Sequence, residues 1–183
     1  LTATPKKESN IISYVDAVQL KNEHMVKLPV IVYNRDSQSE VLIDAIDLRN
    51  KLEEIADAEY TKTGKYIRPI ALFQAQPKGK EDATTFEKLR DKLVDAGIPA
   101  EQIAIRTADV NELKNTDLMS PTCQIRYIIT VNALKEGWDC PYAYILASLA
   151  NKTSQVDVEQ ILGRILRLPH TSQHTQSALN MSY

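Results

Sequence analysis

The feature that most constrains this chain is a series of short apolar runs that alternate with amphipathic segments. Because the runs at 68–75 and 142–150 are almost uninterrupted, they are typical of strands buried on both faces of a parallel sheet. Pro29 places the first half of another run at a sheet edge or strand start. The runs that we interpret as strands span residues 26–33, 68–75, 102–106, 125–131 and 142–150.

Helical patterns fall between these runs. Apolar residues spaced three or four apart predict an amphipathic helix over 41–60, which ends before Gly64. A second helix is predicted over 83–96, and a third begins at the capping residue Ser154 and runs to about Leu168, where Pro169 stops it. Residues 11–20 and 107–124 give no clear pattern. Strands that alternate with helices predict an α/β fold with a mainly parallel sheet covered on both faces.

The composition is that of one globular domain. The 183 residues are 43% hydrophobic and 25% charged, with a formal net charge of −2, so no strongly basic surface indicates nucleic acid. No apolar stretch approaches the roughly 18–20 residues that span a bilayer, and no signal peptide is evident, so we expect no membrane contact. Two cysteines favour a reducing, cytoplasmic compartment. Since the chain starts at Leu1 without Met, we expect it to be cut from a longer one.

Ligands of parallel sheets bind outside the carboxyl ends of the strands. Functional residues are therefore expected just after Ala75, Val131 and Ala150.

The segment 160–167 is the most informative. On a helix, Gln160, Arg164 and Arg167 fall within about 60° of one another, while the apolar residues occupy the other side. Gly163 lies beside this polar trio, where glycine costs about 1 kcal/mol relative to alanine, which suggests close approach to the backbone. The alternatives are a guanidinium fork for a polyanion, because guanidinium binds phosphate bidentately, and a solvated helix face.

The segment 130–139 directly follows the best strand candidate. Gly137 permits a tight turn, and Asp139 could accept hydrogen bonds from a sugar hydroxyl. The alternative is a plain turn with Trp138 plugging the core.

Other groups carry weaker signals. Cys123 and Cys140 lack partners at metal-ligand spacing, and His170 with His174 is a poor ligand pair, so no metal site is predicted. No phosphate-binding loop of the form G-x-x-x-x-G-K-[ST] occurs, and no Asp-Glu pair is present to hold magnesium. The chain by itself is thus expected not to hydrolyse a nucleotide.

Four segments, taken in order, resemble the motifs of superfamily-two helicases and translocases. Their likeness is greatest to the restriction subunit of type III restriction–modification enzymes, through the spellings N-A-L-K-E-G-W-D-C-P and Q-I-L-G-R-I-L-R-L-P. The segments that resemble motifs III, IV, V and VI are, respectively, Leu1–Pro5, Pro69–Gln76, Thr130–Asp139 and Gln160–Arg167.

The resemblance implies a RecA-like (P-loop NTPase-type) three-layer sandwich. Residues 1–10 would close a first RecA-like domain, and residues 11–183 would form the second. ATP and Mg²⁺ would bind in the full-length protein between the two domains, with the phosphate loop and the magnesium carboxylates on the first. This fragment alone would hold no cofactor and would be inactive.

The resemblance also implies roles for single residues. Arg164 and Arg167 would act as arginine fingers on the γ-phosphate, and Gln160 would help to position the nucleotide or the interface between the domains. The implied nucleotide contacts are Gly137, Asp139 and Gly163, with Glu136 coupling ATP to DNA; the implied contacts to the DNA backbone are Thr130, Asn132 and Gln74; and the implied coupling residues are Thr2 and Thr4.

The implied partners are double-stranded DNA, the first RecA-like domain and a modification (methyltransferase) subunit. Two alternatives stay open. The chain could be the second lobe of another superfamily-two motor, such as a type I restriction subunit or a repair helicase. It could also be a non-catalytic RecA-like interaction domain.

Overall fold

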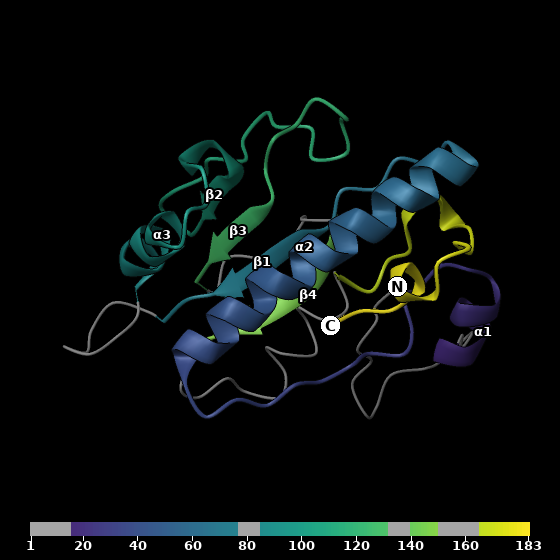
Figure 1. The fold of residues 1–183 in the computed structure, drawn as a ribbon, viewed down its shortest axis with the longest axis horizontal. Coiled ribbons are helices and arrows are strands. Elements are labelled where there is room, and N and C mark those ends of the chain that lie inside the picture. The colour runs from purple at the N-terminus through teal and green to yellow at the C-terminus, as the bar shows by residue number, and fades with distance from the viewer. Residues whose placement is uncertain (1–15, 77–84, 132–139, 150–164) are drawn as a thin grey trace, which may run out of the picture.

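The computed structural model describes residues 16–76, 85–131, 140–149 and 165–183. Figure 1 shows a central sheet with the long helix α2 lying across it. The elements are α1 (Ala17–Asn22), α2 (Gln38–Thr63), β1 (Ile70–Gln74), α3 (Phe86–Asp95), η1 (Ala100–Gln102), β2 (Ile103–Arg106), β3 (Tyr127–Thr130), β4 (Ala143–Ser148), η2 (Pro169–Thr171) and η3 (Ser177–Asn180).

The sheet is parallel throughout, with the strand order β2-β3-β1-β4. All five residues of β1 and all four of β3 are buried, as expected for strands that neighbouring strands and helices cover. The prediction of an α/β fold with a parallel sheet is confirmed, and this arrangement is compatible with a RecA-like three-layer fold.

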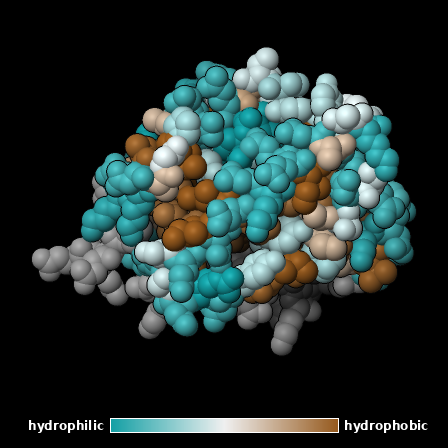
Figure 2. Space-filling view, viewed as in Figure 1, coloured by the Kyte–Doolittle hydropathy of each residue, from teal (hydrophilic) through white to brown (hydrophobic). Residues whose placement is uncertain are grey.

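Helix α2 packs on β1 and β4 through one face. Its buried residues recur every three or four positions, as the sequence predicted, and include Leu42, Ala45, Leu52 and Ala56. Hydrophilic side chains predominate on its outward face (Figure 2). Ser37 and Glu40 form a capping box at its start, and Gly64 ends it with φ 71°.

The run at 26–33 does not form the predicted strand. Val26 and Val30 make only isolated bridges, to Arg167 and to Ser182. The physical reason is that Pro29 donates no backbone hydrogen bond, so a continuous ladder cannot pass through it. The segment instead contacts two different partners on either side of Pro29.

The third predicted helix ends earlier than expected. Most of it lies outside the described residues, but Ile165 is its last helical residue and Arg167 lies in an antiparallel bridge. The helical phase calculated for Arg167 with Gln160 and Arg164 therefore does not apply to Arg167.

The polar segment 107–124, which gave no pattern, is organised by a buried arginine. Arg68 donates from its guanidinium to the carbonyl oxygens of Ser120 (2.8 Å), Ile125 (3.0 Å) and Leu118. A loop without regular structure is thus fastened to the start of β1.

Among the described residues, no helix is both long and apolar enough to cross a bilayer.

Candidate functional site

A row of polar residues lies at the carboxyl edge of the sheet. Each strand ends on one of them, and the strand register places all four side by side. In spatial order, this carboxyl-edge row consists of Arg106, Thr130, Gln74 and Ser148. The row lies at the edge of the sheet where α/β proteins bind their ligands.

Two candidate DNA contacts, Gln74 and Thr130, belong to this row. Their exposed fractions are 4% and 1%, so neither presents a surface to a large ligand. The Gln74 side-chain oxygen accepts from the Ser148 hydroxyl at 3.2 Å. The Thr130 hydroxyl oxygen has no hydrogen-bond partner in the part of the chain that is described. Such a group is costly to bury.

Arg167 lies in a different place, next to the start of β4. Its neighbour Leu166 accepts a hydrogen bond from the Lys27 backbone N–H, and Leu168 donates to Met25. The Lys27 ammonium in turn reaches the carbonyl oxygens of Pro141 (2.8 Å) and Ala143 (2.7 Å). Lys27 therefore contacts the segment around Arg167 through its backbone and the start of β4 through its side chain.

This position differs from the expectation that functional residues gather after Ala75, Val131 and Ala150. Arg167 pairs with Val26, and the neighbouring Lys27 contacts Pro141 and Ala143, so Arg167 lies toward the end of the sheet where β4 begins. The other residues singled out by the sequence lie outside the described residues: Thr2, Thr4, Asn132, Glu136, Gly137, Asp139, Gln160, Gly163 and Arg164.

The cysteine and histidine side chains were the only metal-ligand candidates weighed from the sequence. Among the described residues, no group of three His, Cys, Asp or Glu side chains could hold a metal ion. Cys140 is fully buried, and burial raises the pKa of its thiol to about 11, which keeps it protonated and unreactive at neutral pH.

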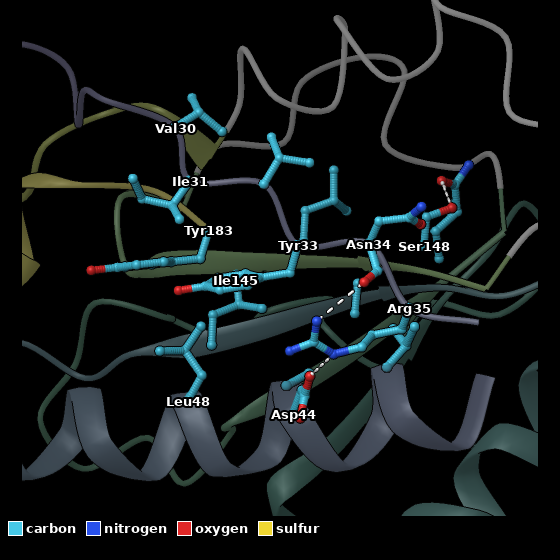
Figure 3. A pocket seen from close by; sticks show the side chains of 16 residues that line it. Val30, Ile31, Tyr33, Asn34, Arg35, Asp44, Leu48, Ile145, Ser148 and Tyr183 are labelled. Carbon is cyan, nitrogen blue, oxygen red and sulfur yellow. Dashed lines mark hydrogen bonds and ion pairs between the residues drawn. The ribbon is translucent and has the colours of Figure 1, made fainter. Parts of the chain in front are cut away.

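A pocket of about 370 Å³ opens beside the outer edge of β4 (Figure 3). Tyr183 borders it and is hydrogen-bonded through its backbone to Tyr144 and Leu146. The ion pair of Arg35 with Asp44 lies at its wall. Gln74 and Ser148 also line this pocket, so it adjoins the carboxyl-edge row. Its apolar lining comes mainly from Val30, Tyr33, Val41, Leu48, Ile145 and Tyr183.

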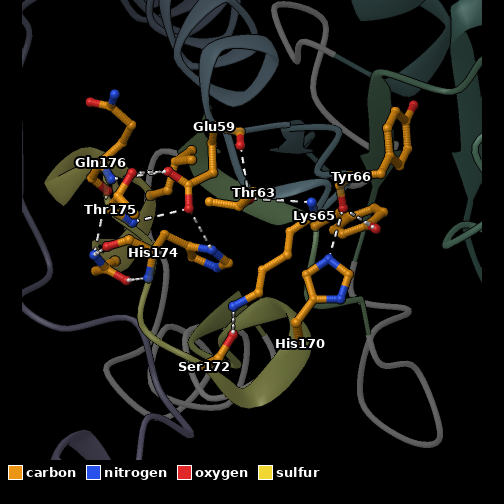
Figure 4. A network of polar contacts seen from close by, with 12 residues as sticks. Glu59, Thr63, Lys65, Tyr66, His170, Ser172, His174, Thr175 and Gln176 are labelled. Atoms are coloured by element: carbon orange, nitrogen blue, oxygen red, sulfur yellow. Dashed lines mark hydrogen bonds and ion pairs between the residues drawn. The ribbon is translucent and has the colours of Figure 1, made fainter. Parts of the chain in front are cut away.

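A buried polar network joins the end of α2 to the C-terminal segment (Figure 4). The Glu59 carboxylate accepts from the backbone N–H of Thr175 (3.0 Å) and Gln176 (3.2 Å) and from the Thr175 hydroxyl (2.5 Å). His174 Nδ1 lies 3.7 Å from the same carboxylate, although neither ring nitrogen has a hydrogen-bond partner among the described residues. The network holds the segment after Arg167 against the protein.

Sequence reasoning missed Lys27 and Glu59, which the structure places in contact with the segments around Arg167. Their contacts join residues 114 and 116 positions apart. One available signal was a charged residue at a position that the surrounding pattern marks as buried, since such residues are almost never buried without a partner.

Neither a protein-family model nor a curated protein matches this sequence.

Proposed function

We propose that this chain is the second RecA-like lobe of an ATP-dependent DNA translocase, most similar to the restriction subunit of type III restriction–modification enzymes. In the full-length protein the lobe works with a first RecA-like domain, and ATP binds between them. Arg164 and Arg167 stabilise the charge that develops on the γ-phosphate. Gln160, Gly163, Gly137 and Asp139 contact the nucleotide.

The position of Arg167 carries this proposal. An arginine finger and Asp139 can serve one nucleotide only if the chain after the third helix meets the chain before β4. The pairing of Val26 with Arg167, and the bonds from Lys27 to Pro141 and Ala143, bring these two stretches together. The meeting supports a shared nucleotide site at this end of the sheet.

The carboxyl-edge row supports a separate role at the opposite end. Because Gln74 and Thr130 are buried, we assign them to the support of the loops that follow β1 and β3. Asn132 and the loop after Gln74 contact the DNA backbone, and Glu136 couples the two sites. Contacts to phosphate require only a local cluster of donors, so a net charge of −2 is compatible with DNA binding.

ATP would supply the free energy for movement along DNA, and Mg²⁺ would neutralise its phosphates. The described residues fit only a part of this site. Arg167 would contribute a guanidinium. As the family resemblance implies, we assign the magnesium carboxylates to the first lobe, with Thr2 and Thr4 coupling the two lobes.

The test is to replace Arg164 or Arg167 with alanine in the full-length protein and to measure DNA-stimulated ATP hydrolysis. We expect kcat to fall by about 100-fold or more, since an arginine finger contributes roughly 10³–10⁵. The control is Arg90→Ala, because Arg90 on α3 pairs with Glu112 and makes no contact with 165–168 or 140–143 among the described residues.

An unchanged kcat in both alanine variants would overturn the arginine-finger assignment and favour a non-catalytic interaction domain. DNA cleavage that requires ATP would favour a restriction enzyme over a repair helicase.

A further inference from the structure

Lys27 is a fully buried lysine, with an exposed fraction of 0%, in the stretch between α1 and α2. Its ammonium donates to the carbonyl oxygens of Pro141 (2.8 Å) and Ala143 (2.7 Å) and lies 4.0 Å from the centre of the Tyr144 ring. Removing an ammonium from water costs several kcal/mol unless polar groups replace its hydration. These carbonyls and the aromatic face provide part of that replacement.

The backbone of the same residue contacts a second segment. The Lys27 N–H donates to the Leu166 carbonyl, and the Leu168 N–H donates to Met25 at 3.0 Å, which sets Val26 opposite Arg167. One residue thus joins the start of β4 to the stretch that follows Arg164. These two segments lie more than 20 residues apart in the sequence.

The backbone pairing alone does not require a charged side chain. A methionine would fill a similar volume without the cost of burying a charge. What the ammonium adds is a fixed position for two carbonyl groups, those of Pro141 and Ala143. Pro141 lies in the turn that precedes β4, and Ala143 is the first residue of β4.

We propose that Lys27 is a positioning residue that fixes Arg167 relative to the turn after Asp139. The inference rests on the proposed function, because it assumes that these two residues serve one nucleotide. Lys27 acts through the segments it holds.

The test uses Lys27→Met in the full-length protein, with ATP and duplex DNA. We expect kcat/KM for ATP to fall by about tenfold or more, because a misplacement of 1 Å can cost on the order of 100-fold. Arg49→Met is the matched control. It removes another buried cation, which bonds to Asn50 and Glu53 on α2 and contacts neither segment in the described part of the chain. Its kcat/KM should stay within about twofold of wild type at comparable loss of stability.

A double-mutant cycle separates positioning from a general loss of stability. If Lys27 acts through Arg167, Lys27→Met should have little further effect on kcat/KM in an Arg167→Ala background, while the stability losses still add. Additive effects on kcat/KM would overturn the proposal. If Lys27→Met does not fold, Lys27→Gln, which keeps an N–H donor, is measured in the same cycle and judged by the same criterion.

Hydrogen exchange on the 183-residue chain gives a readout that does not depend on activity. Lys27→Met should speed exchange of amides in 140–143 and 166–168 but not in β2. Unchanged protection of 140–143 and 166–168 would contradict the proposal.

Failure of the positioning role and failure of the proposed function give different results. If Arg164→Ala and Arg167→Ala lower ATPase while Lys27→Met changes neither exchange nor kcat/KM, the positioning role alone is wrong. If the arginine variants are also fully active, the proposed function is wrong.

Discussion

Three buried charged side chains, Lys27, Glu59 and Arg68, fasten distant parts of the chain to one another. Each is at most 1% exposed, and each contacts backbone groups in irregular segments. Burying a charge is costly, so its hydrogen bonds are needed to keep the folded state stable. These residues hold the segments before β4, before β3 and after the third helix, none of which has a continuous ladder of its own.

His174 makes the stability of this arrangement depend on pH. Burial lowers the pKa of His174 to about 4 against its ordinary 6.5, an effect that Glu59 opposes and the nearby His170 and Lys65 reinforce. The unfolded chain therefore binds more protons between pH 6.5 and 4. The free energy of unfolding should fall by roughly 3 kcal/mol as the pH drops through that window.

Urea unfolding from pH 7.5 to 4 tests this expectation with His174→Gln. The decline between pH 6.5 and 4 should be much smaller in the variant, whereas His24→Gln, at an exposed position, should keep the wild-type profile. Burial raises the pKa of Glu59, but the hydrogen bonds from Thr175 and Gln176 outweigh it and lower that pKa below 4.5. A further decline below pH 4.5 should therefore remain in both variants. A His174→Gln profile that matches wild type would contradict the account.

At the scale of elements, α2 illustrates how a sequence pattern becomes a structure. Its capping box at Ser37 and Glu40 satisfies backbone donors that the first turn leaves unpaired. Ser37→Ala should lower the free energy of unfolding by about 1 kcal/mol. The measurement is urea unfolding beside Ser39→Ala, an exposed position two residues later, where alanine is the better helix former. Equal effects of the two substitutions would show that the cap is not stabilising.

The elements that the sequence predicted well are those with local patterns. The helix expected over 41–60 spans 38–63, and the strand expected over 125–131 spans 127–130. The six-residue helix α1 was missed because it is too short to show a period and buries none of its residues. The prediction of a strand over 26–33 was wrong, because an apolar run does not reveal which segments are available to pair with it.

The candidate site was predictable only in part. Gln74 and Thr130 lie at the strand ends where the sequence put them, because strand boundaries follow from local composition. The place of Arg167 could not be derived, since it depends on pairing with Val26 across the fold. The role of Lys27 could not be derived for the same reason.

At the scale of the whole molecule, the parallel sheet separates two regions. Arg167 lies beside the residues that enter β4, and the carboxyl-edge row of Arg106, Thr130, Gln74 and Ser148 lies at the opposite end of the strands. In the translocase that we propose, the buried strands β1, β3 and β4 would connect a nucleotide site beside Arg167 to a DNA site at the carboxyl edge.

The most direct test of the translocase is ATP hydrolysis by the full-length protein on duplexes of increasing length, at equal concentration of DNA ends. A translocase that moves along DNA hydrolyses more ATP each time it binds a longer duplex, because it takes more steps before it reaches the end. The account predicts a steady-state rate that is stimulated by duplex DNA and rises with its length until a plateau. Hydrolysis that does not depend on DNA, or the absence of hydrolysis, would contradict it.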